Sequence, residues 1–391
     1  MSRLFPGSAA VAVLVAGCAV AQDFNAAAPN SPEQRPAFAG QTRAPVLADA
    51  VMLDTTEIVR GLEHPWGMAR LPDGAWLVTE RPGRLRMVGA DGALSDPIGG
   101  LPAIDAGGQG GLLDVIVGPG FASDRRLWIS YAAPAPGGNQ TGVATATLSA
   151  DGRTLENLRE IFRQAPAYDG DKHFGSRLVL DGTGGLFVTL GERSDTPIRD
   201  TAQQDDNHLG KIVRIDPLTG AAMGAGLGLP ETWAKGFRNV QAAALDGQGQ
   251  LWTIEHGPRG GDELNRVEAG RNYGWPVITY GEDYSGRPIN EGITARDGME
   301  QPVYYWDPVI APSGMVFYDG AMFPDWSGDI LTGGLRDQSL VRLRLADGRV
   351  AGEARYLKGI GRVRDVEVAA DGAIMILTDA ADGAMIRVTP R

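Results

Sequence analysis

A short pattern that recurs along the chain constrains its fold more than any other feature of the sequence. A turn containing Asp-Gly is followed by an apolar stretch that often ends in threonine. The clear copies are residues 72–79, 181–190, 246–254 and 370–378, and the looser copies are residues 123–131 and 327–334. Turn chemistry between short apolar stretches is typical of successive β-strands. The comparable strand positions are Trp76, Trp128, Phe187, Trp252, Ile330 and Met375.

Six copies of one strand-and-turn unit predict an all-β fold, a six-bladed β-propeller of four-stranded antiparallel blades. The comparable positions are 52, 59, 65, 78 and 45 residues apart, so the longest loop insertion is expected between the fourth and fifth units. Glycine supplies 55 of 391 residues, about twice the usual ~7%, and this favours turns over long helices. Chance turns in another all-β sandwich or barrel remain the alternative on this pattern alone.

The first residues have the features of a secretion signal. Arg3 precedes an apolar stretch at residues 9–16, and small residues follow, as in signal peptides. Cleavage after Ala21 is one interpretation, and lipidation of Cys18 in a lipobox is the other; both stay open. The apolar stretch is shorter than the ~18 residues of a membrane span, so a periplasmic or secreted protein is expected, either free or anchored by a lipid on Cys18.

The chain is expected to contain one folded domain, preceded by a signal peptide and a flexible segment. Residues 1–21 are assigned to the signal peptide, residues 22–50 to a flexible segment rich in Ala, Pro, Asn and Gln, and residues 51–391 to the propeller. Long stretches without periodic apolar positions are typical of flexible leads.

Charge and motifs exclude several classes of function. The chain has 36 Lys and Arg against 48 Asp and Glu, a formal net charge of 36 − 48 = −12, which argues against a general nucleic-acid binder. One cysteine allows no intramolecular disulfide and no multi-cysteine metal site. The sequence has no zinc-protease motif, nucleophile elbow or phosphate loop, and the glycine cluster at residues 107–111 does not follow the dinucleotide fingerprint.

Polar residues follow five of the six repeated strands. They are Glu80-Arg81, Glu192-Arg193, Glu255-His256, Arg336 and Asp379. Because strand ends in a propeller surround the central channel, these side chains are candidates for a site. A solvated rim of salt bridges is the alternative for any one of them.

Among the four histidines, His173 is the candidate general base. It lies in a polar, glycine-containing turn that leads into an apolar strand, and an imidazole with an ordinary pKa near 6.5 accepts a proton at neutral pH. His64, before Pro65 at the entry to the first unit, and His208, directly before a strand, are expected to be structural.

The segment at residues 255–276 is the densest candidate for metal chemistry. Its glycines allow close backbone approach, Pro258 offers a carbonyl, and Asp262 and Glu263 supply carboxylate oxygens. Such oxygens suit calcium, although the spacing is not that of an EF-hand. A tight acidic turn without metal is the alternative.

Eight segments in order along the chain resemble the glucose/sorbosone dehydrogenase family, specifically the soluble quinoprotein aldose sugar dehydrogenases that use pyrroloquinoline quinone (PQQ). They are residues 61–74 (GLEHPWGMARLPDG), 107–115, 173–182 (HFGSRLVLDG), 209–215, 236–241 (GFRNVQ), 255–276, 311–315 and 362–366. The resemblance implies a six-bladed propeller and oxidation of the C1 hydroxyl of aldoses to lactones. It further implies base-assisted hydride transfer to PQQ, Ca²⁺ as a second cofactor, and an external electron acceptor.

The resemblance also implies roles for individual residues. His173 is the implied base and Arg238 stabilises charge on the quinone. Gln109 contacts cofactor and sugar, and Tyr284 borders the sugar entrance. The implied cofactor-binding residues are Gln109, Arg238, Asn239, Arg336, Arg362 and Arg364, and the implied calcium positions are Gly257 and Pro258, with Glu263 and Tyr273 at another.

Two positions depart from the family pattern. Arg336 stands where lysine is usual, and Lys172 stands before the histidine where the better-known soluble glucose dehydrogenases have aspartate, leaving Asp169 or Asp171 to orient His173. Two other classes stay open: a calcium-dependent propeller lactonase and a non-catalytic binding module. The implied cofactor-facing residues favour the dehydrogenase.

Overall fold

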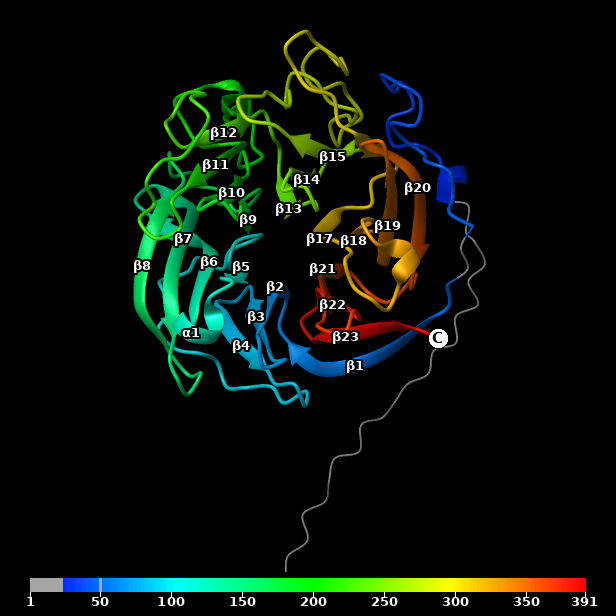
Figure 1. Ribbon diagram of the computed structural model, residues 1–391. Helices are drawn as coiled ribbons and strands as arrows, with labels where there is room; N and C mark the ends of the chain where they lie inside the picture. Colours follow the sequence, from blue (N-terminus) through cyan, green and yellow to red (C-terminus); the bar gives the residue numbers. More distant parts are fainter. Residues whose placement is uncertain (1–23, 49–50) are drawn as a thin grey trace, which may run out of the picture.

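The six repeated strands of the sequence occupy equivalent places in six sheets around one axis (Figure 1). In the computed structural model, which describes residues 24–48 and 51–391, each is the second strand of its sheet, counted from the axis. They are β3 (Trp76–Glu80), β6 (Arg126–Ala135), β10 (Leu186–Leu190), β14 (Leu251–Glu255), β18 (Ile330–Gly334) and β22 (Ile374–Thr378). The predicted six-bladed propeller is confirmed.

The innermost strands surround the central channel and run antiparallel to the repeated strands. They are β2 (Pro65–Arg70), β5 (Leu112–Val117), β9 (Gly175–Leu180), β13 (Val240–Leu245), β17 (Pro312–Phe317) and β21 (Val363–Val368). The outer strands are β4 (Arg84–Val88), β7 (Gly138–Leu148), β8 (Leu155–Arg163), β11 (Lys211–Ile215), β12 (Thr232–Lys235), β15 (Asp262–Val267), β16 (Tyr304–Trp306), β19 (Ser339–Ala346) and β20 (Arg349–Tyr356).

The first and last blades differ from the other four. The first blade has three strands, β2, β3 and β4, and an irregular segment at residues 94–98 covers its outer edge through two isolated bridges, Val88 to Leu94 and Leu85 to Ile98. The last blade takes its outermost strand from the other end of the chain, because β1 (Leu53–Leu62) pairs antiparallel with β23 (Gly383–Pro390). This pairing closes the ring (Figure 1).

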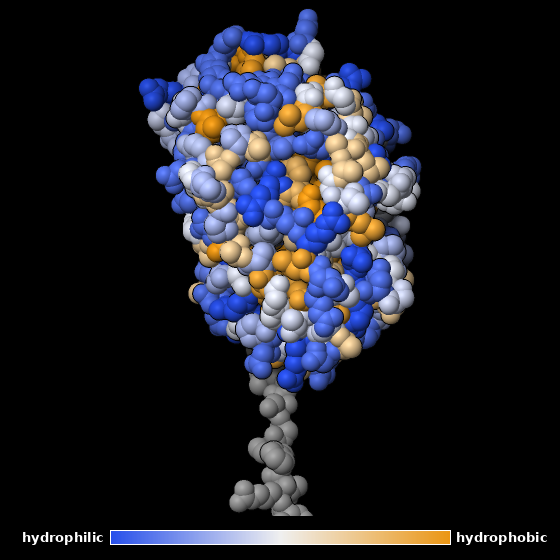
Figure 2. Space-filling view, turned by 90° about the vertical axis from the view of Figure 1, so that its left-hand side faces the viewer, coloured by the Kyte–Doolittle hydropathy of each residue, from blue (hydrophilic) through white to orange (hydrophobic). Residues whose placement is uncertain are grey.

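Apolar side chains hold neighbouring blades together. The repeated strands β3, β10, β14, β18 and β22 are buried along their whole length, and clusters such as that of Trp252, Met315 and Leu343 join adjacent sheets. The outer face over β7 and β8 is mostly hydrophilic, with only small separate hydrophobic areas (Figure 2). The core therefore lies between the blades.

Residues 24–48 pack against the fourth and fifth blades, which differs from the expected flexible lead. The Asp307 carboxylate accepts hydrogen bonds from the backbone N–H groups of Asn30 (2.5 Å) and Ser31 (3.0 Å). The buried Gln41 side chain donates to the Pro302 carbonyl (2.9 Å), and the Ala44 N–H donates to the Tyr304 hydroxyl. Polar contacts with residues far along the chain hold this segment, and its local composition does not show them.

Helices are few and short in the described residues: α1 (Phe121–Asp124) and 3₁₀ turns at Phe24–Ala26, Ile198–Gln203 and Pro324–Trp326. None of them has the length and apolar character needed to span a membrane. The expected signal peptide and Cys18 lie outside the described residues.

Candidate active site

A cavity of about 250 Å³ lies on the propeller axis, where the innermost strands begin and the repeated strands end. The innermost strands contribute Trp66, Leu113, Gly175, Gln241 and Arg364, and the ends of the repeated strands contribute Arg81, His256, Leu335 and Asp379; Gln109, Phe174, Asn239 and Arg362 complete the wall. The expectation that polar residues after repeated strands surround the channel is met at three of the five places, by Arg81, His256 and Asp379. Trp66, Leu113, Gln241 and Leu335 also line the cavity. The first three lie within segments that carry the resemblance, but none of the four was predicted as a site residue.

His173 lies at the edge of this cavity, directly before Phe174 and Gly175. Its side chain is buried, its Nδ1 lies 2.6 Å from Oε2 of Glu192, and its backbone N–H donates to Oε1 of Gln109 at 2.9 Å. A carboxylate at Nδ1 requires the proton on that nitrogen and leaves the Nε2 lone pair to accept one. Burial lowers the pKa of His173 below its ordinary value, so the imidazole is neutral at pH 7 and competent as a base.

Glu192 is the orienting partner of His173, and the expectation of Asp169 or Asp171 is wrong. Glu192 is fully buried and also accepts hydrogen bonds from the Ser194 N–H (2.8 Å) and from Nε1 of Trp275 (3.2 Å). Strand β10 pairs with β9 so that Leu190 faces Gly175, which places the residues after β10 beside those before β9. The signal was present in the sequence, since Glu192 follows the third repeated strand.

Arginine side chains give the cavity an excess of positive charge. Arg81, Arg362 and Arg364 line it with one carboxylate, Asp379, whose Oδ2 lies 3.3 Å from Arg362 and 3.5 Å from Arg364. Burial alone would raise the pKa of Asp379, but Arg364 and a hydrogen bond from His64 hold it at about 2. Burial, followed by the nearby arginines, lowers the pKa of Arg364 to about 10. Asp379 and Arg364 are therefore both charged at neutral pH.

Two of these guanidinium groups have an unused buried donor. Nε of Arg81 and Nε of Arg364 have no hydrogen-bond partner among the described residues. A buried donor without a partner is costly, and three arginines facing one carboxylate leave excess positive charge. A small molecule with several carboxylates, such as PQQ, would satisfy both, so the residues present fit this cofactor.

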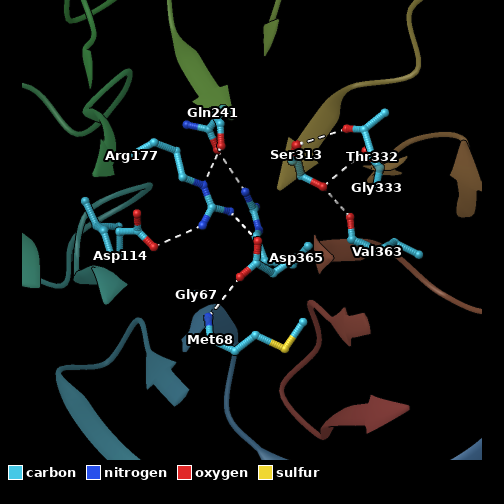
Figure 3. Close-up of polar contacts among 12 residues, drawn as sticks. Gly67, Met68, Asp114, Arg177, Gln241, Ser313, Thr332, Gly333, Val363 and Asp365 are labelled. Atoms are coloured by element: carbon cyan, nitrogen blue, oxygen red, sulfur yellow. Dashed lines mark hydrogen bonds and ion pairs between the residues drawn. The ribbon is translucent and has the colours of Figure 1, made fainter. Parts of the chain in front are cut away.

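Arg177 connects the innermost strands beside the cavity (Figure 3). It is buried and donates to Asp114 (3.0 Å) and Asp365 (2.7 Å) and to the backbone carbonyl of Gln241 (2.9 Å). The Gln241 side chain in turn accepts a hydrogen bond from Arg364 at 2.9 Å. One ion-pair network thus joins the second, third, fourth and sixth blades to a residue of the cavity wall.

Asn239 lines the cavity, and Arg238, which directly precedes it, is not among the lining residues. The Oδ1 of Asn239 accepts hydrogen bonds from Gly175 N–H and from Gln241 Nε2, both at 3.2 Å. Arg238 is buried, and its Nη1 donates to the carbonyls of His256 (2.9 Å) and Gly257 (2.8 Å). The guanidinium therefore faces the backbone that is expected to bind calcium.

The loop at residues 257–261 is held by a buried carboxylate. Asp262 accepts hydrogen bonds from the N–H groups of Gly257, Ile310 and Ala311 at 2.8 to 2.9 Å. The described residues contain no group of three or more His, Cys, Asp or Glu side chains arranged to hold a metal ion. Gly257 and Pro258 could contribute only backbone carbonyls, and that of Gly257 faces Arg238.

Glu255 and Glu263 pair across β14 and β15 behind this loop. Burial raises the pKa of Glu255 to about 7 and that of Glu263 well above its usual value. The neighbouring Asn265 donates to Glu255 at 3.3 Å, and its buried Oδ1 has no donor among the described residues. Two carboxylates and an unused amide oxygen form a donor set that suits a calcium ion.

Three of the predicted residues are not brought to these places. The Tyr273 hydroxyl donates to the Arg266 carbonyl and accepts a hydrogen bond from the Glu268 N–H. Neither partner is Glu263, with which Tyr273 was predicted to share a calcium position. Arg336 is exposed in the turn after β18, and Tyr284 is 74% exposed in the long loop between β15 and β16. Neither Arg336 nor Tyr284 lines the cavity. Both lie in loops, whose path the strand pattern does not predict. The rings of His64 and His208 form hydrogen bonds with Asp379 (2.9 Å) and Glu231 (2.6 Å).

A model of the Glucose / Sorbosone dehydrogenase family matches residues 62–387, which span the propeller. The chain belongs to the glucose/sorbosone dehydrogenase family. Among its relatives is the aldose sugar dehydrogenase YliI of Escherichia coli (strain K12), which is 42% identical over 342 residues, covering 84% of this chain and 91% of that protein. The predicted family is thus confirmed, and the protein is a sugar dehydrogenase.

Solved structures of glucose and aldose sugar dehydrogenases have the same fold as this family member. A crystal structure of a glucose dehydrogenase superposes with a TM-score of 0.82 at 44% identity, covering 85% of this chain and 98% of that chain. The PQQ-bound aldose sugar dehydrogenase of Streptomyces coelicolor superposes with a TM-score of 0.71 at 26% identity, covering 87% and 100%.

Proposed function

We propose that this sugar dehydrogenase oxidises the C1 hydroxyl of aldoses to lactones, with PQQ and Ca²⁺ as cofactors and an external electron acceptor. The observation that carries the proposal is the pairing of buried, neutral His173 with Glu192 at the edge of a cavity lined by arginines. A lactonase would also use a polar cavity but has no need of unpaired arginine donors. The S. coelicolor relative, solved with PQQ bound, supports the choice of cofactor.

The chain's own residues would act on the sugar as follows. Nε2 of His173 accepts the proton of the C1 hydroxyl, and Glu192 stabilises the imidazolium that forms. Gln109 holds the His173 backbone and lines the cavity, which supports a contact between Gln109 and the sugar. When bound, PQQ supplies the acceptor for the hydride that leaves C1.

Arg81, Arg362 and Arg364 would hold the carboxylates of PQQ, and Arg238 and Asn239 would orient it. Arg238 acts by preorganised positive charge. Calcium would bind at the Gly257 and Pro258 carbonyls, where it would act as a Lewis acid. A second calcium would bind at Glu263, where it would satisfy the oxygens of Glu255 and Asn265. The proposal keeps the roles that the resemblance implies for Arg336, Tyr273 and Tyr284, although none of the three lines the cavity.

The first residues of the sequence support the choice of cell compartment. We infer a periplasmic or secreted enzyme, either free or anchored through Cys18, that passes electrons to an external acceptor. Electrophoretic and mass-spectrometric analysis of the mature N-terminus distinguishes cleavage after Ala21 from lipidation of Cys18.

One assay tests the activity. Purified apoprotein is combined with Ca²⁺, PQQ, a panel of aldoses and an artificial dye, and dye reduction that needs all components is expected. PQQ binding without dye reduction for any aldose would contradict the proposal. Hydrolysis of a lactone by the metal-loaded protein without PQQ would favour the lactonase instead. Removal of Ca²⁺ with a chelator is expected to abolish dye reduction, and added Ca²⁺ to restore it.

A further inference from the structure

Arg193 follows Glu192 directly and is fully buried beside His173. Its guanidinium donates four hydrogen bonds. Nε bonds the carbonyl of Lys172 (2.9 Å), Nη1 the carbonyl of Asn139 (3.2 Å), and Nη2 both Oδ1 of Asn139 (2.6 Å) and the carbonyl of Gly170 (2.6 Å). The Lys172 carbonyl belongs to the peptide group that joins Lys172 to His173. Arg193 thus fixes the backbone on the N-terminal side of the base.

The same guanidinium also contacts the residue on the other side of His173. Its carbon lies 4.0 Å from the centre of the Phe174 ring, a close cation–π contact. Among the described residues no carboxylate lies within ion-pair distance of Arg193, so its charge is met by backbone oxygens, one amide and this ring. Burial lowers the pKa of Arg193 to about 10, which keeps it charged at neutral pH.

The backbone that Arg193 holds is in a conformation that needs support. His173, Arg193 and Ser194 have φ values of 50°, 71° and 76°. Residues with side chains rarely adopt this left-handed region, and the backbone stays in it only where surrounding contacts impose it. Glu192 accepts the Ser194 N–H at 2.8 Å and also meets His173 Nδ1 at 2.6 Å, so the turn after β10 and the turn before β9 are held together.

We propose that Arg193 is a positioning residue of the dehydrogenase: its guanidinium fixes the backbone on both sides of His173 so that the ring meets Glu192. This proposal rests on the proposed function, in which His173 is the base. Glu192 and Arg193 then divide one task, since the first sets the ring's tautomer and the second sets the ring's place. Arg193 does not line the cavity, so it acts on the base and not on the cofactor.

Kinetics and cofactor binding test the proposal in the PQQ- and Ca²⁺-loaded enzyme. Misplacing a catalytic group by about 1 Å costs about 100-fold in rate, so Arg193→Ala is expected to lower kcat about 100-fold. PQQ affinity, measured by fluorescence titration of the apoprotein, and KM are expected to stay unchanged. Guanidinium at sub-denaturing concentration should restore part of kcat by filling the space of the deleted group.

The matched control is Arg342→Ala. Arg342 is also fully buried, but it lies in the fifth blade, where it pairs with Asp329 and packs on Trp326. Its loss is expected to lower stability and to leave kcat of the folded fraction unchanged, with no rescue by guanidinium. If Arg193→Ala does not fold, Arg193→Lys replaces it. Lysine keeps the positive charge but cannot reach all four acceptors, so kcat is expected to fall about 10-fold for a partial misplacement of His173.

A spectroscopic arm separates this proposal from the assignment of activity. The ring N–H proton of the His173–Glu192 hydrogen bond should give a downfield signal in the NMR spectrum of the histidine-labelled apoprotein. The chain has only four histidines, so this signal is assigned by its loss in His173→Ala. Arg193→Ala or Arg193→Lys is expected to weaken or shift this signal, and guanidinium to return it in the alanine variant. An unchanged signal, or an unchanged kcat, in a folded Arg193 variant would overturn the proposal. A wild type with the signal but no aldose oxidation would overturn only the proposed function.

Discussion

At the scale of single residues, the chemistry of the site depends on one short hydrogen bond. His173 and Glu192 are both buried and meet at 2.6 Å. Burial alone would raise the pKa of Glu192, but His173, Arg238 and the Ser194 N–H lower it below its ordinary value. Glu192 is therefore ionised and His173 neutral at pH 7, the combination that a base of this kind needs. Activity should be lost only below the ordinary histidine pKa of 6.5, when His173 becomes protonated.

Glu192→Gln is expected to lower kcat by about 10²- to 10⁴-fold, the usual contribution of acid–base catalysis. The acid limb of kcat/KM should also move to lower pH, because the negative charge that raises the pKa of His173 is removed. The measurement is the pH–rate profile of both proteins. Asp171→Asn, at an exposed residue, serves as the control and should keep the wild-type profile; a large loss there would restore Asp171 as the partner.

Arg364→Gln is expected to weaken PQQ binding about 10- to 100-fold, since a hydrogen bond to a charged group contributes about 1.5–3 kcal/mol. Fluorescence titration of the apoprotein with PQQ measures the affinity. Arg387→Gln, on the same blade but paired with Asp371 at the surface, should bind PQQ as the wild type does. Equal affinities for the two variants would remove Arg364 from the cofactor site.

At the scale of elements, residues 24–48 are attached through the Asp307 carboxylate. Asp307→Ala leaves the Asn30 and Ser31 N–H groups without their acceptor, at a cost of about 1–3 kcal/mol for each buried unpaired group. We expect a lower free energy of unfolding and faster proteolytic cleavage within residues 24–48. Asp319→Ala, at an exposed residue, is the control, and equal cleavage rates in the two variants would show that this contact does not hold the segment.

The strand pattern predicted those elements whose signal is local. Each repeated strand carries its own apolar run and turn, so Trp76 and Met375 could be aligned without knowledge of the fold. Glu192 was not identified as the partner of His173 because that contact depends on the register of β10 against β9. The irregular edge of the first blade and the packing of Gln41 on Pro302 depend on residues distant in sequence, which no local pattern reports.

At the scale of the whole molecule, buried acids set the pH dependence of stability. Burial raises the pKa of Asp114 to about 6, of Asp262 to about 7 and of Glu367 to about 8. The folded protein therefore binds more protons than the unfolded chain between the ordinary values of 3.8 to 4.5 and these raised values. Stability from these groups is largest at low pH and is lost as pH rises through this window.

Glu367→Gln is expected to raise the melting temperature at pH 8 and to change it little at pH 5, where Glu367 is already protonated in the folded state. The gain at pH 8 should be about 1 kcal/mol, less than the full pKa shift implies because the residue is partly exposed. Thermal unfolding at both pH values measures it. Glu156→Gln, at an exposed residue, is the control, and an equal change at the two pH values for Glu367→Gln would contradict the expectation.

The pairing of β1 with β23 has a consequence for synthesis. Leu53 and Pro390 are partners 390 − 53 = 337 residues apart, and at about 5–20 residues per second the ribosome needs roughly 17 to 70 s to make the second after the first. Until then β1 has no partner and the last blade has an open edge, which is where chains add to one another. A chain shortened before Gly383 would keep that edge permanently. Deletion of β23 should therefore cause more aggregation during expression than deletion of any other stretch of equal length.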